Sequence, residues 1–253
     1  MNLSSSETDQ PQEEIGGATT LKEAAYHALS ALLIRGELKA GQTLTLREAS
    51  QLSGFGVGPA RDAIFQLASE GALQVLPNRS AVVPLLSRVE FDEIYEVRCI
   101  LEGFAAARAA FNISAVGIRS LRRHLEAVEN ALDRLDIKCV LQSNRDFHFG
   151  IYSTSNSKSL VEMIERLWLR FGPTLTMLAG SERLDRKQFF RDSYDFHVQL
   201  VDALHRRDPE GARTAIVKTL TASKHLEYYS TSPPVYDIVT YEKVQLDMQN
   251  AAE

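Results

Sequence analysis

The sequence predicts a mainly α-helical protein in two parts: an N-terminal winged helix-turn-helix with a small β-hairpin wing, and a C-terminal antiparallel, all-helical bundle. Three observations predict this fold. Residues 45–83 have the pattern of two short helices and a hairpin. Capping boxes open helices at several points along the chain. After Val83 the apolar spacing is helical throughout, without the alternation that a half-buried strand requires.

The chain begins with a segment that has little to bury. Residues 1–19 are rich in Ser, Glu, Gln and Gly, and we expect a disordered tail there. Thr20 and Glu23 then form a capping box, which predicts the start of a helix. Gly36 is a residue at which that helix can end.

The next stretch carries the helix-turn-helix pattern. Thr45 and Glu48 form a second capping box, and Gly54 offers the turn after the first motif helix. A second helix is expected to start near Pro59, since proline is tolerated in the first helical turn, and to end at Gly71. Two apolar runs separated by Pro-Asn-Arg-Ser then predict a hairpin. The DNA-binding domain should therefore span residues 20–84, with its second helix in a major groove.

The rest of the chain predicts a bundle over residues 87–230. Ser87 and Glu90 form a third capping box, and the pair Asp208-Pro209 marks another helix start. The apolar spacing predicts helices over residues 88–111, 115–135, 138–154, 158–179, 187–206 and 209–229. Residues 231–253 form a C-terminal extension that is too apolar for a plain tail, and the sequence leaves its packing open.

Composition indicates a soluble, cytoplasmic protein. Of its 253 residues, 44% are apolar and 24% are charged, as in ordinary globular domains. The sequence contains no eighteen-residue apolar run, and the start has no apolar segment of a secretory signal, so no membrane partner is expected. Cys99 and Cys139 are far apart and fit a reduced pair. The net charge of −5 gives no sign of nucleic-acid binding, so a few well-placed arginines must supply it.

The motifs together resemble a known family. The segments LKAGQTL, PARDAI, LASEGAL and PNRSAVV, in this order, resemble the DNA-binding domain of GntR-family bacterial transcription regulators. The helical part resembles the ligand-binding domain of the FadR-like branch, and the likeness covers roughly residues 20–230. It implies a regulator that binds double-stranded DNA as a homodimer and responds to a small organic acid.

The resemblance also implies DNA contacts, and here the chain departs from the family pattern. A serine and an arginine are common just before the recognition-helix proline, where this chain has Gly56 and Val57. Arg61 remains as the candidate to reach a base or a phosphate, with an exposed pair to Asp62 as the alternative. The further DNA-binding candidates are Pro59, Arg79 at the wing tip, Arg47 and Gln66.

Several polar side chains in the bundle are expected to face one core. Asn144, His148 and Tyr152 share an otherwise apolar helical face, and His197 lies in a similar one. Arg98 also lies on an apolar stripe, with Glu102 one turn further as an ion-pair partner. Such groups form either a satisfied internal network or the lining of an effector cavity.

The resemblance sharpens this expectation. FadR-like domains often hold a divalent metal with an aspartate and three histidines, at positions that correspond here to Asn144, His148, His197 and Thr219. Two imidazoles, an amide and a hydroxyl suit Zn, Ni or Mn poorly, so we expect such a metal to be weakly bound or absent. Direct recognition of an organic acid by Arg98, or by Arg170, is the alternative.

The function predicted from the sequence is that of a ligand-responsive regulator, and most simply a repressor, rather than an enzyme. Two alternatives stay open at this point. One is a metal-dependent hydrolase that uses His148 and His197, although HExxH, GxSxG and phosphate-binding glycine motifs are missing from the sequence. The other is a metabolite-binding module that has lost DNA binding, which the replaced serine and arginine would explain.

Overall fold

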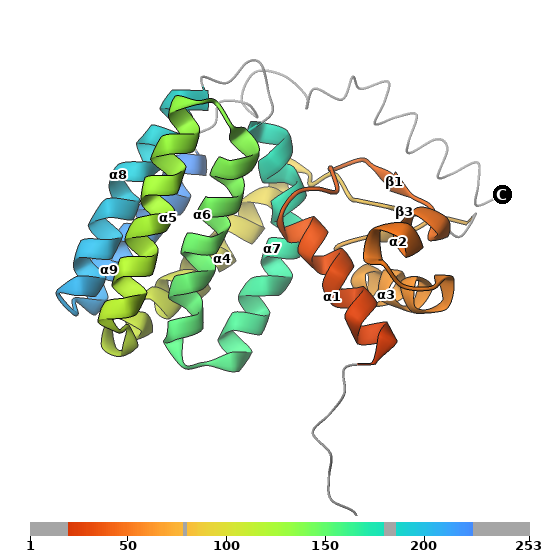
Figure 1. The fold of residues 1–253 in the computed structure, drawn as a ribbon, viewed down its shortest axis with the longest axis horizontal. Coiled ribbons are helices and arrows are strands. Elements are labelled where there is room, and N and C mark those ends of the chain that lie inside the picture. Colours follow the sequence, from red (N-terminus) through yellow and green to blue (C-terminus); the bar gives the residue numbers. More distant parts are fainter. Residues whose placement is uncertain (1–19, 78–79, 180–185, 225–253) are drawn as a thin grey trace, which may run out of the picture.

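The computed structural model describes residues 20–77, 80–179 and 186–224 and confirms the mainly helical fold. Figure 1 shows a winged helix on one side of the molecule and a helical bundle on the other, with α7 at the border between them. The predicted tail, the wing-tip residue Arg79 and the C-terminal extension lie outside the described residues.

The N-terminal part contains three helices and a three-stranded antiparallel sheet in the order β1-β3-β2. Its elements are α1 (Leu21–Ile34), β1 (Thr43–Leu44), α2 (Leu46–Ser53), α3 (Val57–Ser69), β2 (Gln74–Val75) and β3 (Ala81–Val82). The hairpin β2-β3 agrees with the prediction, whereas β1 was not predicted. In β1, Thr43 pairs with Val82 and Leu44 pairs with Ala81, so the wing is anchored to the segment before the motif.

Local chemistry sets the helix boundaries. The side chains of Thr20, Thr45 and Ser87 each accept a hydrogen bond from the backbone N–H of the glutamate three residues later. The carboxylate of that glutamate accepts one from the backbone N–H of the capping residue, so all three capping boxes are present. Gly54 closes α2 with a φ of 76°, a left-handed conformation that glycine adopts without strain. Helix α3 begins at Val57, two residues before Pro59. The proline still lies in the first turn, where its missing N–H breaks no helical hydrogen bond.

The C-terminal part consists of helices that pack antiparallel. They are α4 (Arg88–Asn112), α5 (Ala115–Asp133), α6 (Ile137–Tyr152), a 3-10 turn η1 (Ser153–Ser155), α7 (Lys158–Ala179), α8 (Arg186–His205) and α9 (Pro209–Lys224). The predicted ends lie within two residues of these bounds, and the predicted extension of the last helix to 229 lies outside the described residues. Within the described ranges, we find no helix with the length and apolarity needed to cross a membrane.

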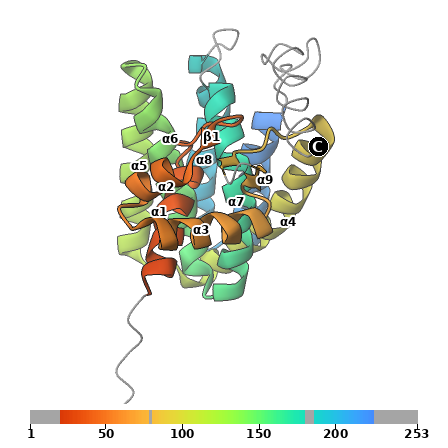
Figure 2. The same cartoon turned by 90° about the vertical axis from the view of Figure 1, so that its right-hand side faces the viewer.

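Helix α7 belongs to both parts of the protein. Its Trp168 lies in the main core of the bundle, whereas the next residue, Leu169, lies in the core of the winged helix. Gly172 lies so close to α1 that a Cβ there would be 2.7 Å from the carbonyl oxygen of Leu33. In the view of Figure 2, the winged helix lies in front of α7 and α4 lies at the edge of the bundle. Helix α7 is therefore packed tightly against both the bundle and the winged helix.

Candidate functional site

The first candidate site is the exposed face of the winged helix. Arg61 lies on α3 with half of its side chain exposed, and its Nη2 is 3.4 Å from Oδ1 of Asp62. This ion pair is solvated and contributes little, so a phosphate or a guanine could replace it. Arg47 is exposed on α2, whereas Pro59 and Gln66 are half-buried on α3.

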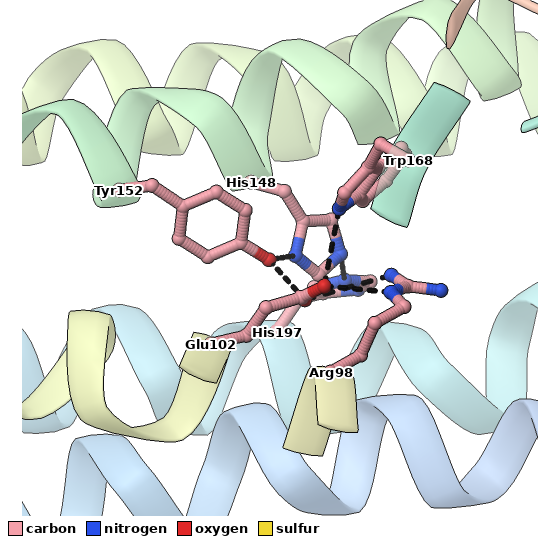
Figure 3. Close-up of polar contacts among 6 residues, drawn as sticks. All are labelled: Arg98, Glu102, His148, Tyr152, Trp168 and His197. Atoms are coloured by element: carbon pink, nitrogen blue, oxygen red, sulfur yellow. Dashed lines mark hydrogen bonds and ion pairs between the residues drawn. The ribbon is translucent and has the colours of Figure 1, made fainter. Parts of the chain in front are cut away.

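The second candidate site is a buried polar network in the bundle, drawn in Figure 3. Its centre is Glu102 of α4, which is completely buried. Arg98 Nε donates to Oε1 of this carboxylate at 2.6 Å, and Trp168 Nε1 donates to the same oxygen at 3.1 Å. The hydroxyl of Tyr152 donates to Oε2. Three donors from three helices therefore satisfy one buried carboxylate.

Two histidines extend this network. The Tyr152 hydroxyl donates to Glu102, so its oxygen accepts from His148 Nδ1, 2.8 Å away. His148 Nε2 is then the acceptor of its ring, and it receives the N–H of His197 Nε2 at 3.1 Å. This assignment makes both imidazoles neutral. It follows from the hydrogen-bond partners, because His148 then donates from Nδ1 and accepts at Nε2.

Burial keeps both histidines uncharged. Burial is the main cause that holds the pKa of His148 well below its ordinary value, with His197 and Arg98 as further causes. Burial alone lowers the pKa of His197 to about 3. Burial and the Glu102 carboxylate raise the pKa of Tyr152, so its hydroxyl stays a donor.

We expect the protein to lose stability as the pH falls from about 6.5 toward 3. The folded pKa of each histidine lies below its value of about 6.5 in the unfolded chain, so the unfolded chain binds more protons in this range. The slope should approach about 1.4 kcal/mol per pH unit for each histidine. Urea denaturation between pH 7.5 and 5 measures it. The variant His197→Gln should flatten the curve, whereas a change at the exposed His205 on the same helix should not. Equal slopes for both variants would contradict the argument.

A small cavity of about 30 Å³ adjoins the network. Arg98, Asn144, His148, His197 and Thr219 line it, together with apolar residues of α4, α7, α8 and α9. The guanidinium of Arg98 lies 4.1 Å from the ring centre of Phe171, and its Nη1 has no hydrogen-bond partner among the described residues. The buried guanidinium of Arg98 therefore has an unused hydrogen-bond donor beside a cavity of mixed polar and apolar lining.

The structure brings the predicted effector residues together except for Arg170. Tyr152 belongs to the network, although it is not part of the cavity lining. Arg170, predicted as a second anion-binding residue, lies outside the cavity, where its Nη2 is 3.7 Å from Glu90 and its side chain lies beside Gly71. The prediction for Arg170 does not fit this placement, because Arg170 faces the winged helix rather than the bundle core.

The sequence reasoning missed Trp168, which donates to Glu102 and lines the cavity. The signal was present, since a tryptophan in a buried stripe needs an acceptor for its indole N–H. Glu102 was predicted only as the partner of Arg98, whereas it is the centre of the network.

The donor set fits a divalent metal poorly. The Nε2 atoms of His148 and His197 face each other, but Asn144 offers a neutral amide and the Thr219 hydroxyl donates to the carbonyl of Ala215. The buried guanidinium of Arg98 would also repel a cation. Over residues 20–77, 80–179 and 186–224, no group of three or more His, Cys, Asp or Glu side chains is placed to hold a metal ion.

A winged helix joined to a helical bundle with a small cavity is an arrangement in which one part can bind DNA and the other can bind a ligand, as in transcription regulators with a separate regulatory domain. Residues 21–83 match the family model of bacterial regulatory proteins of the gntR family, and residues 93–222 match the FCD domain. The chain therefore belongs to the GntR family of transcription regulators, in its FCD-containing branch. It is a regulator and not an enzyme, which answers the hydrolase alternative.

Relatives agree with this assignment. The chain is 32% identical over 185 residues to the HTH-type transcriptional regulator McbR of Escherichia coli K12, a match that covers 73% of this chain and 82% of McbR. It is 25% identical over 202 residues to the transcriptional repressor GlaR of the same organism, covering 72% of this chain and 84% of GlaR. The solved structure of E. coli McbR/YncC superposes with a TM-score of 0.77 at 29% identity, covering 85% of this chain and all of that one.

Proposed function

We propose that this regulator is a repressor that binds a palindromic operator as a homodimer and leaves it when a small organic acid enters the bundle. The observation that carries the proposal is the unpartnered Nη1 of Arg98 beside the cavity. A carboxylate would complete the hydrogen bonds of this guanidinium, and such charge-assisted bonds are among the strongest in proteins. Similarity to GlaR, which is named a repressor, supports the sign of the regulation.

The size of the cavity supports a coupling between ligand binding and a change in the conformation of the bundle. A space of about 30 Å³ holds a water molecule or two but not an organic acid. The acid must therefore push the lining apart, and Trp168 and Phe171 of α7 belong to that lining. The ligand binds the opened arrangement and so shifts the population toward it.

Helix α7 can pass this change to the DNA-binding part. Trp168 and Phe171 face the cavity, whereas Leu169 lies in the core of the winged helix. Gly172 lets the backbone of α7 touch the end of α1, at Leu33 and Ile34. Because these contacts are close-packed, a displacement of α7 reorients the winged helix. In a dimer, this reorientation changes the spacing of the two recognition helices.

Titration of the protein–operator complex with carboxylic acids of two to six carbons tests the proposal. An operator obtained by in-vitro selection is labelled, and its affinity is followed by fluorescence anisotropy. At least one acid should weaken binding tenfold or more. The variant Asn144→Leu, which places an apolar side chain at the cavity, should lose this response and keep DNA binding, whereas Gln142→Leu on the exposed side of α6 should keep both. An operator complex that no acid alters would refute the effector role.

An exposed face of α4 supports the homodimer. Val97, Ile100, Phe104 and Phe111 are between 43% and 70% exposed, and their spacings of three, four and seven residues are those of a coiled-coil seam. Glu96 lies near the start of this seam and Arg108 near its end. Two copies of α4 packed antiparallel about a two-fold axis would place the acidic end of one beside the basic end of the other.

Breaking this seam should produce monomers. A charge at its centre, as in Ile100→Asp, would have to be buried without a partner in the dimer. We expect a monomer by sedimentation velocity at micromolar concentration, with an unchanged circular dichroism spectrum because Ile100 is 70% exposed. Val116→Asp, at a 62% exposed position on α5, is the matched control and should remain dimeric. If Ile100→Asp and the control sediment alike, the dimer uses another surface.

A further inference from the structure

The recognition helix presents an apolar face that the buried core does not explain. Val57 and Phe65 are each 53% exposed, and they lie four residues before and after Arg61 on the same side of α3. A helix that met only water and phosphates would gain nothing from these side chains. The face therefore fits a partner that offers apolar groups on both sides of the point that Arg61 reaches.

The start of α3 carries few side chains around Val57. Gly56 is the N-cap and makes no side-chain cap. A Cβ added at Gly54 or Gly58 would meet nothing within 4 Å. Val57 is thus a side chain between two glycines, at the end of the helix that can approach a partner most closely.

In the major groove of DNA, the apolar feature of the base edges is the C5-methyl group of thymine, whereas the other groups donate or accept hydrogen bonds. An isopropyl group can do neither. We infer that Val57 reads a thymine methyl group in each operator half-site. The inference rests on the proposed DNA-binding function and names part of its target: duplex DNA with a thymine beside the pair that Arg61 contacts.

Helix geometry gives the position of this thymine. Four helical residues rise about 6 Å, and successive base pairs are about 3.4 Å apart, so the thymine should lie one or two base pairs from the Arg61 contact. Phe65 lies the same distance on the other side of Arg61 and would face the opposite end of the half-site.

Deoxyuridine offers a direct test, because it differs from thymidine only by the methyl group. An operator is first selected from a random duplex library with the wild-type protein. Each thymine of the half-site is then replaced in turn by deoxyuridine, and the affinity is measured for the wild type, Val57→Ser and Val57→Thr. At one thymine, the wild type should bind roughly fourfold more weakly without the methyl, and roughly fifteenfold more weakly when both half-sites change.

The variants separate the contact from a general effect of DNA shape. Val57→Ser, which carries no methyl group, should bind thymine and deoxyuridine operators equally, whereas Val57→Thr, which keeps one, should still discriminate. Val57→Arg should select guanine at that position instead, since arginine pairs with the O6 and N7 atoms of guanine.

The outcomes distinguish a failure of the proposed DNA-binding function from a failure of the inference about Val57. A wild type that enriches no sequence at low salt would overturn the DNA-binding function, and the inference about Val57 with it. A selected operator in which no thymine is sensitive to loss of its methyl would overturn the inference alone. Equal sensitivity in the wild type and Val57→Ser would also overturn it, because the methyl would then be read by another residue.

Discussion

Replacing Glu102 with glutamine is expected to lower the free energy of unfolding of the bundle by about 3–5 kcal/mol. Glutamine keeps the shape, and its one carbonyl oxygen can still accept from Trp168, but its NH2 group can only donate and so cannot accept from Tyr152. It removes the negative charge, however, and leaves the guanidinium of Arg98 buried without a counterion. The loss should therefore reflect an unpaired charge rather than a cavity.

Denaturation by guanidinium chloride, followed by tryptophan fluorescence, measures this effect, because Trp168 is the one tryptophan of the chain and contacts Glu102. Glu96→Gln changes an exposed carboxylate on the same helix and should cost less than about 0.5 kcal/mol. A Glu102→Gln variant within 1 kcal/mol of the wild type would mean that Arg98 finds another counterion or solvent.

The double variant Arg98→Met with Glu102→Gln tests whether the ion pair contributes to stability or to ligand binding. Removing both charges should restore most of the lost stability, because a buried ion pair contributes little net stability compared with apolar side chains of similar size. It should also abolish the response to organic acids, since the free donor of Arg98 is gone. Restored folding together with a persistent acid response would assign ligand binding to other residues.

Most of the architecture could be predicted from the sequence because its signals are local. A capping box uses residues three apart, and all three predicted boxes open helices in the structure. Strand β1 is different. It has two residues, and its hydrogen bonds come from β3, almost forty residues further along the chain. Nothing within Thr43–Leu44 itself reports a partner at that distance.

In the candidate site, contacts within one helix could be predicted, whereas contacts between helices could not. Helical spacing placed Arg98 with Glu102 and His148 with Tyr152, since these pairs are four residues apart on one helix. The contact between His148 and His197 depends on which helices become neighbours, which spacing alone cannot give. Arg170 was misplaced because α7 is buried on two sides, so its faces cannot be sorted into core and solvent.

Replacing Arg61 with alanine should weaken operator binding by between about thirtyfold and ten-thousandfold. The range follows from a loss of about 1 to 2.7 kcal/mol for a guanine contact in each of two half-sites, if the losses add. Arg61 is exposed on α3 and held only by a solvated pair to Asp62, so the change should leave folding intact. Arg119→Ala, at an exposed position on α5, is the control that removes the same charge far from the DNA-binding part.

The variant Arg61→Lys distinguishes the two ways in which Arg61 could act. Lysine keeps the charge but lacks the planar pair of donors that fits guanine. If Arg61 reads a base, the lysine variant should bind the selected operator weakly and tolerate changes at one base pair; if it contacts a phosphate, it should bind nearly as the wild type does. Salt titrations add a second criterion, because loss of one phosphate contact per subunit lowers the salt dependence by about two ions per dimer. An alanine variant that selects the same operator with the same affinity would remove Arg61 from the interface. Base recognition would then rest on the other candidates, Arg47 of α2 and Gln66 of α3.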